Sequence, residues 1–110
     1  MLRVVVCRIW HGWTTPQNAE AYEKIVRGEV IPSIEARRIP GFRHIDLLRR
    51  EAGDEVESST LMWFDHLGAV KEFMGEDYSL IHVPAAARAV LSRFDERASH
   101  WQAIDRRTQQ

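Results

Sequence analysis

The sequence predicts an α+β fold, with one antiparallel sheet and helices on one of its faces, and three observations support this prediction. The 110 residues are 45% hydrophobic, which suits a single domain, since domains typically run to roughly 100–150 residues. Apolar segments of strand length alternate with segments of helical spacing, in the order strand, helix, strand, strand, helix, strand. A buried strand, Leu61–Asp65, ends in an aromatic pair and turns at once into a helix.

The first half of the chain is predicted to form a strand and a kinked helix. The near-continuous apolar run Arg3–Trp13 indicates a strand with both faces covered. Thr15 and Pro16 are residue types typical of an N-cap and a first helical position, and apolar residues follow at helical spacing. Pro32 falls inside that pattern, and its ring presses on the carbonyl of Gly28. We therefore expect a kink rather than the end of the helix.

The second half is predicted to form a hairpin, two helices and a last strand. Phe42–Arg50 and Val56–Asp65 are expected to pair as antiparallel strands around a Gly-containing loop. A second helix starts at an Asp65 cap, and a third, shorter helix opens at Pro84. Arg97–Ile104 is the expected last strand.

This βαββαβ order is that of the ferredoxin-like fold, with a four-stranded antiparallel sheet. Right-handed crossovers place the first and third strands, which are also the most apolar, at the sheet centre. The fold is expected over residues 1–104, with a polar tail at 105–110. The helices cover one sheet face, and a second copy packed sheet to sheet is the simplest cover for the other, so we expect a homodimer.

Composition narrows the class of function. A formal net charge of −1 gives no electrostatic reason to expect nucleic acid or a membrane surface as a partner. No segment reaches the roughly 20 apolar residues of a membrane-spanning helix. Met1–Trp10 is too short for one, is interrupted by Arg8 and lacks a signal-peptide cleavage site, so a cytoplasmic location is expected. The single cysteine, Cys7, sits in an apolar run and is expected to be a buried small hydrophobe.

Five segments together resemble one known family. They are Arg8-Ile9-Trp10, the capped helix from Pro16, Ile39-Pro40-Gly41-Phe42, Leu61-Met62-Trp63-Phe64-Asp65, and Ser99-His100-Trp101. In this order they make the chain similar to the antibiotic biosynthesis monooxygenase superfamily of dimeric α+β barrels. The resemblance implies a cavity between the sheet and the helices of each protomer. It also implies one of two chemistries, a quinone-forming branch that needs no metal or flavin and a haem-degrading branch.

The quinone-forming branch oxidises aromatic polyketides with dioxygen, which requires an aromatic-lined cavity, a base and hydrogen bonds to substrate oxygens. The resemblance implies His82 and Arg8 as the catalytic candidates, while His11 and His100 remain possible bases. The candidate residues for binding a small apolar or aromatic ligand are Trp10, Trp63, Phe73, Tyr78, Arg88 and His100. The histidines show no His-x-His spacing and the chain no Cys-x-x-Cys motif, so no metal site is expected.

Arg8 needs a partner, because an unpaired charge in a central apolar strand is very costly. One interpretation is a salt bridge to Glu57 or to a carboxylate of a second copy. The other is that Arg8, sharing a face with Trp10 in the family register, anchors an anionic or phenolate ligand. His100 alternates with Trp101, so these two side chains should face opposite sides of the sheet.

Haem degradation is a weaker alternative. His82 stands four residues after Tyr78 and matches the family segment that carries the iron-binding histidine. However, Phe73 stands at the family's Trp position, and Trp10 stands at its Asn position. We therefore expect no cofactor. The expected function is a cofactor-independent monooxygenase-like activity on a small aromatic molecule, and the other alternative is a non-catalytic barrel that binds or senses such a ligand.

Overall fold

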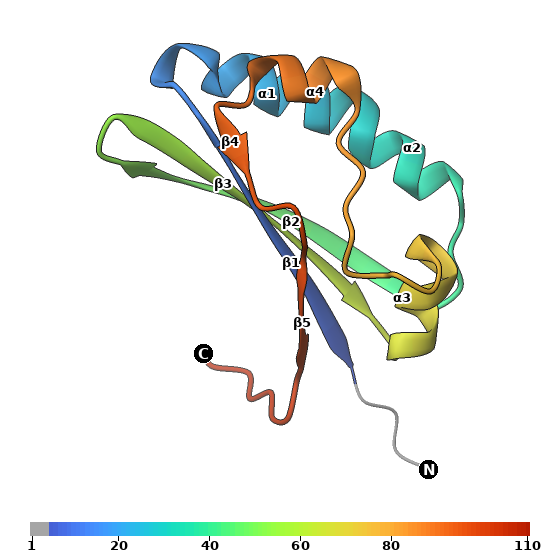
Figure 1. The fold of residues 1–110 in the computed structure, drawn as a ribbon. Helices are drawn as coiled ribbons and strands as arrows, with labels where there is room; N and C mark the ends of the chain where they lie inside the picture. The colour runs from blue at the N-terminus through green and yellow to red at the C-terminus, as the bar shows by residue number, and fades with distance from the viewer. Residues whose placement is uncertain (1–4) are drawn as a thin grey trace.

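The structure, a computed structural model, describes residues 5–110 and has one antiparallel sheet (Figure 1). β1 (Val6–Thr14) and β3 (Glu55–Phe64) lie at its centre and pair along their whole length, from Val6 opposite Phe64 to Thr14 opposite Val56. β2 (Phe42–Ala52) forms one edge, and β4 (Arg93–Phe94) and β5 (Ser99–Gln102) form the other. The predicted hairpin and the predicted central strands are confirmed. The predicted start of the first strand, at Arg3, lies outside the described residues.

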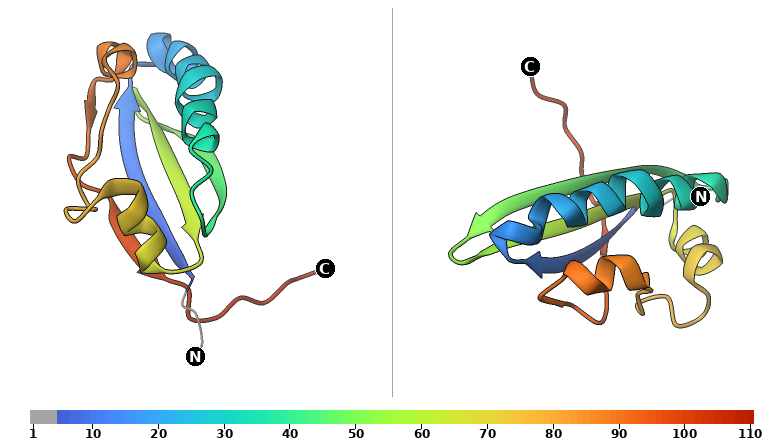
Figure 2. Two further views of the ribbon diagram at one scale, coloured as in Figure 1. Left: turned by 90° about the vertical axis from the view of Figure 1, so that its right-hand side faces the viewer. Right: turned by 90° about the horizontal axis from the view of Figure 1, so that it is seen from above.

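The helical elements lie against one face of the sheet, as predicted. They are η1 (Pro16–Asn18), α1 (Ala19–Ile25), η2 (Val26–Val30), α2 (Ile31–Ala36), α3 (Leu67–Met74) and α4 (Ala85–Val90). The first four follow one another as a single long run that crosses the sheet, with α4 beside α1, while α3 follows the end of β3 (Figures 1 and 2). None of the helices in residues 5–110 is long and apolar enough to cross a membrane.

The long helical run continues through Pro32, and a π-helical segment accommodates the proline. In η2 the backbone N–H of Ile31 donates to the carbonyl of Val26, five residues earlier. Proline has no N–H, and its ring crowds the carbonyl four residues before it, so a wider turn just upstream relieves both problems. The spacing predicted the irregularity at this position but not its type.

The start of α3 corrects one prediction. The N-cap is His66, whose Nδ1 accepts a hydrogen bond from the backbone N–H of Ala69 at 3.2 Å, and not Asp65. The Asp65 carboxylate instead accepts hydrogen bonds from Nε and Nη2 of Arg43 on β2. Arg43 thus engages the carboxylate that was predicted to cap the helix. Gly75, with φ of +88°, ends the helix.

The predicted last strand, Arg97–Ile104, is shorter in the structure, where only Ser99–Gln102 forms β5, and β4 (Arg93–Phe94) precedes it at a position where no strand was predicted. Between β4 and β5 the chain leaves β1, and the N–H of Ala98 donates to the carbonyl of Ser79 at 2.7 Å. A loop between α3 and α4 therefore takes over hydrogen bonding that a continuous edge strand would have directed to β1. The short strand β4 makes the sheet five-stranded instead of four-stranded, and the predicted topology is otherwise unchanged.

The helix-covered face is packed in two clusters. One surrounds the fully buried Phe64 and Val70 near α3, and the other surrounds Tyr22 and Val83 beneath α1 and α4. On the open face Cys7 is only 4% exposed, as expected for a buried small hydrophobe. The tail after Gln102 forms no helix or strand and places Arg106 4.9 Å from the centre of the Trp63 ring.

Candidate functional site

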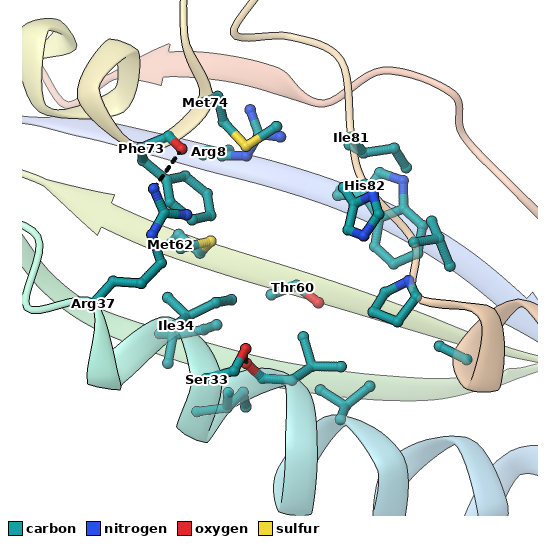
Figure 3. Close-up of a pocket in the computed structure, with 18 of the residues that line it drawn as sticks. Arg8, Ser33, Ile34, Arg37, Thr60, Met62, Phe73, Met74, Ile81 and His82 are labelled. Carbon is teal, nitrogen blue, oxygen red and sulfur yellow. Dashed lines mark hydrogen bonds between the residues drawn. The ribbon is translucent and has the colours of Figure 1, made fainter.

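A cavity of about 220 Å³ lies between the sheet and the helices, where the two core clusters meet (Figure 3). Its sheet floor is formed by Arg8, Trp10, Ile45, Thr60 and Met62. One wall comes from the helical run between residues 22 and 37, and the other from residues 73–87. Among the described residues that line it, none is an aspartate or a glutamate. The volume lies somewhat below the roughly 300–1,000 Å³ of pockets for drug-sized molecules, which suits a ligand of one or two rings.

His82 and Arg8, the two residues predicted for catalysis, both line this cavity. His82 is exposed and stands on the loop between α3 and α4, whereas Arg8 is buried in the floor (Figure 3). Trp10 and Phe73 also line it. The indole N–H of Trp10 donates to the carbonyl of Asp95 at 2.6 Å, so Trp10 offers the cavity an apolar ring and no free donor.

Arg8 is held by acceptors from the loop that carries His82. Its guanidinium donates to the backbone carbonyl of Tyr78 and, at 3.1 Å, to that of Leu80, and its Nη1 lies 3.0 Å from Nε2 of His100. Burial lowers the pKa of Arg8 to about 10, so the group stays charged near neutrality. Burial, and secondarily the charge of Arg8, lower the pKa of His100 to about 4, so its neutral ring accepts the hydrogen bond. Arg8 thus fixes the loop from below.

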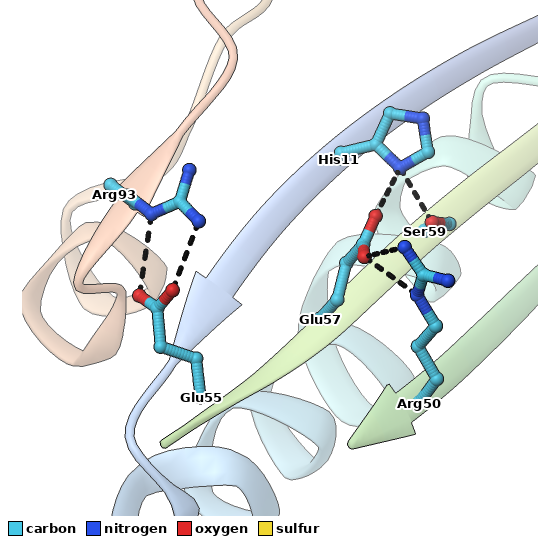
Figure 4. Close-up of polar contacts among 6 residues, drawn as sticks. All are labelled: His11, Arg50, Glu55, Glu57, Ser59 and Arg93. Carbon is cyan, nitrogen blue, oxygen red and sulfur yellow. Dashed lines mark hydrogen bonds and ion pairs between the residues drawn. The ribbon is translucent and has the colours of Figure 1, made fainter. Parts of the chain in front are cut away.

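The alternative of an Arg8–Glu57 salt bridge is wrong. Arg8 stands opposite Met62 and Glu57 stands opposite Trp13, so the strand alternation puts the two charges on opposite faces of the sheet. Glu57 lies on the open face, where it contacts Nδ1 of His11 at 3.1 Å and the guanidinium of Arg50 at 2.8 Å (Figure 4). His11, considered as a possible base, therefore belongs to this cluster and not to the cavity.

Four residues predicted to bind a ligand lie outside the cavity lining; they are Trp63, Tyr78, Arg88 and His100. Trp63 is on the open face, opposite Cys7, and donates to Asp46 at 3.1 Å. Alternation allows only one of two successive aromatics to face the helices, and Phe64 takes that side. The ring of Tyr78 meets His100 edge to face at 5.0 Å, and the exposed Arg88 lies 5.9 Å from the Phe94 ring.

Arg37 is a cavity residue that the sequence reasoning missed. Its Nη2 donates to the carbonyl of Phe73 at 3.0 Å, and its guanidinium carbon lies 4.8 Å from the centre of the Phe73 ring (Figure 3). Ser33, one helical turn earlier, lines the same wall. Arg37 comes three residues after Ile34, the last apolar residue of the helical stripe, so the two lie on the same face of the helix. This spacing could have indicated that Arg37 faces the sheet.

The cavity residues do not fit a haem group. The donor of Trp10 is already engaged by Asp95, and Phe73 has no polar atom to offer an iron-bound ligand. The cavity is also too small for a haem macrocycle, because its volume already lies below that of pockets for drug-sized ligands. Within residues 5–110 no group of three His, Cys, Asp or Glu side chains is arranged to hold a metal ion.

Comparison with known proteins gives a likeness in structure alone. No protein-family model matches the chain, and no curated protein matches it significantly. A protein from Bacillus cereus, named provisionally as an antibiotic biosynthesis monooxygenase, superposes with a TM-score of 0.68 at 10% identity, covering 96% of this chain and 99% of that chain. Rv0793 from Mycobacterium tuberculosis gives a TM-score of 0.61 at 18% identity, covering 94% and 99%.

A more distant likeness is to SnoaB, a cofactor-independent oxygenase from Streptomyces nogalater, with a TM-score of 0.49 at 17% identity and 96% of each chain covered. The superpositions on the Bacillus cereus protein and on Rv0793 cover nearly the whole chain. They therefore include the complete sheet and the helices that cover one of its faces. The chain therefore has the same fold as these two proteins.

Proposed function

We propose that the protein is a monooxygenase-like enzyme that oxidises a small aromatic molecule in the cavity between its sheet and helices, without a cofactor. The observation that carries this proposal is the cavity itself, apolar in its walls, with the exposed imidazole of His82 at its rim. The fold shared with a protein named as an antibiotic biosynthesis monooxygenase supports the same reaction class.

In the proposed reaction His82 acts as the general base. A neutral imidazole accepts a proton from a ring CH₂ group that an adjoining phenol or carbonyl makes acidic, and the resulting carbanion is electron-rich enough to react with dioxygen. One oxygen atom becomes a ring carbonyl, and the other leaves as water with the two hydrogens of the CH₂ group. The apolar surfaces of Trp10, Met62 and Phe73 would exclude bulk water from that anion.

Arg8 has a different role in this proposal from that of His82. Its hydrogen bonds go to two loop carbonyls and to His100, so it positions the loop and provides a fixed positive charge beneath the cavity. A positive charge in a low-dielectric floor stabilises an anion above it.

The test is oxygen consumption with two isomeric hydroxytetralones, which are two-ring phenols that carry ring CH₂ groups. Wild type should consume oxygen in proportion to substrate, and His82→Ala should lose at least about 100-fold of that rate, which is the usual contribution of a general base. His44→Ala is the matched control, because His44 lies on the opposite sheet face against Trp63. No uptake above background with either substrate would remove the enzymatic proposal.

A second candidate function is ligand binding without turnover. The observation that favours it is that both Arg8 and His100 are engaged with the protein itself, which leaves His82 as the cavity's one candidate base among the described residues. Thermal stabilisation by an aromatic ligand without oxygen uptake would select this function over the enzymatic one.

We also propose that two copies pack through the open sheet face. Leu48 is 50% and Trp101 60% exposed there, and Ile9, Leu61 and Trp63 stand on the same face by strand register. Apolar side chains gathered on one sheet face favour burial against another protein. Light scattering at micromolar concentration should give a dimer mass, and Leu48→Glu should shift it toward the monomer. A monomeric wild type would contradict this assembly.

A further inference from the structure

We propose that Arg37 selects the substrate by binding a carboxylate on an otherwise apolar aromatic molecule. This inference rests on the proposed function in one respect, since both place the ligand in the same cavity. It goes further because it names the chemical class of the ligand, an aromatic acid, and the residue that recognises it.

The first step concerns the charge of the cavity. Its lining includes two guanidinium groups, those of Arg8 and Arg37, and no carboxylate among the described residues. Other arginines of the described chain pair with acids, for example Arg49 with Glu23 at 3.2 Å and Arg93 with Glu55 at 2.9 Å. An apolar cavity with positive charge and no internal counter-charge favours an anionic ligand.

The second step separates the two cations. Arg8 is buried, and its donors are committed to the carbonyls of Tyr78 and Leu80 and to His100. Arg37 is exposed and forms one hydrogen bond, to the Phe73 carbonyl; within residues 5–110 it makes no ion pair with an acid. A guanidinium has five N–H donors in a fork that matches a carboxylate, so Arg37 has donors left for a ligand.

The third step concerns where the carboxylate would lie. The guanidinium of Arg37 is stacked on the Phe73 ring at 4.8 Å, and that of Arg8 lies 5.9 Å from the same ring. Figure 3 shows Arg37, Arg8 and Phe73 at one end of the cavity and His82 at the other. This arrangement would hold an aromatic acid with its carboxylate at the Phe73 end and its reactive ring position toward His82.

The experiment is a binding titration with a matched pair of probes, 2-naphthoate and 2-naphthamide, followed by calorimetry. The two probes differ in charge and share the same rings. Wild type should bind 2-naphthoate about tenfold more tightly than 2-naphthamide, as expected for one charge-assisted contact at a partly exposed site. Arg37→Gln should reduce this preference to less than twofold. Arg37→Lys should keep part of it, because the charge remains but the fork is lost.

Arg38→Gln is the matched control, since Arg38 is adjacent and exposed but does not line the cavity. It should retain the full preference. Equal binding of both probes to wild type, or a preference that survives Arg37→Gln, would overturn the assignment to Arg37 and leave the proposed function standing. Failure of both probes to bind wild type would count against the cavity as a ligand site, and so against both proposals.

Discussion

Nη1 of Arg8 and Nε2 of His100 lie 3.0 Å apart beneath the loop that carries His82. The contact joins the central strand β1 to the edge strand β5, and Arg8 extends it to the loop through the Tyr78 and Leu80 carbonyls. A buried cation, a neutral histidine and two carbonyls thus set the position of the cavity's candidate base.

Replacing Arg8 by methionine should destabilise the fold by about 2–3 kcal/mol, because two partly buried backbone carbonyls and His100 lose their donor. Urea unfolding measures this loss. Arg107→Met is the control, since Arg107 lies in the exposed tail and pairs only with Asp105 nearby, and its effect should stay within about 0.5 kcal/mol. Equal stabilities of Arg8→Met and wild type would show that Arg8 does not anchor the loop.

Protonation of His100 should lower stability in acid. Its pKa is about 4 in the folded protein, below the ordinary value of 6.5, so the unfolded chain takes up the proton more readily. The contribution of neutral His100 to the free energy of unfolding is complete above pH 6.5 and is lost as the pH falls toward 4. The loss should be about 1–2 kcal/mol, after discounting for the partly exposed ring.

Urea unfolding at several pH values in that window measures this contribution. His100→Gln is the comparison, because glutamine keeps an acceptor for Arg8 but does not titrate. The variant should lose less stability than wild type across the window, and identical pH profiles would contradict the assignment.

The Cys7 thiol should be unreactive in the native protein. Burial, with a smaller effect from Asp46, raises its pKa, and the side chain is 4% exposed. With 5,5′-dithiobis(2-nitrobenzoate) at pH 8, less than about a tenth of the native thiol should react in the time that the urea-unfolded chain reacts completely. Rapid native reaction would mean that this part of the open face is accessible.

Two glycine substitutions should act in opposite directions. Gly41 has φ of +84°, and an added Cβ would lie 3.0 Å from Cβ of Ala69, so Gly41→Ala should destabilise by about 2 kcal/mol. Gly28, inside the long helical run, has no heavy atom within 4 Å of an added Cβ, so Gly28→Ala should stabilise by about 0.5–1 kcal/mol. Thermal denaturation of the two variants measures both, and the same sign for both would refute the conformational argument.

The sequence alone predicted the topology because the dominant signals are local. Apolar alternation identifies β1 and β3, and the Gly53-Asp54 turn joins β2 to β3. The right-handed crossover rule then places β1 and β3 at the centre of the sheet. Details that depend on a tertiary contact were not predicted. Asp65 has the chemistry of a cap, yet Arg43 binds it. The last strand starts later than predicted, at Ser99, because Ala98 bonds to Ser79.

The site was predicted in part for a similar reason. Four of the candidate residues line the cavity, namely His82, Arg8, Trp10 and Phe73, and their roles there stay predictions. Trp63 does not, because alternation gives the relation between neighbouring side chains but not which of them faces the helices. Arg37 was missed because an exposed arginine at a helix end has the usual character of a solvated residue, and only packing against Phe73 distinguishes it.

The cavity as a ligand site is tested most directly by the indole N–H signals of the four tryptophans in a ¹⁵N-correlated NMR titration with 2-naphthoate. Trp10 lines the cavity, whereas Trp63 and Trp101 stand on the open face. A ligand in the cavity should move the Trp10 signal saturably and leave those of Trp63 and Trp101 in place. Movement of the open-face signals with an unchanged Trp10 signal would contradict the assignment.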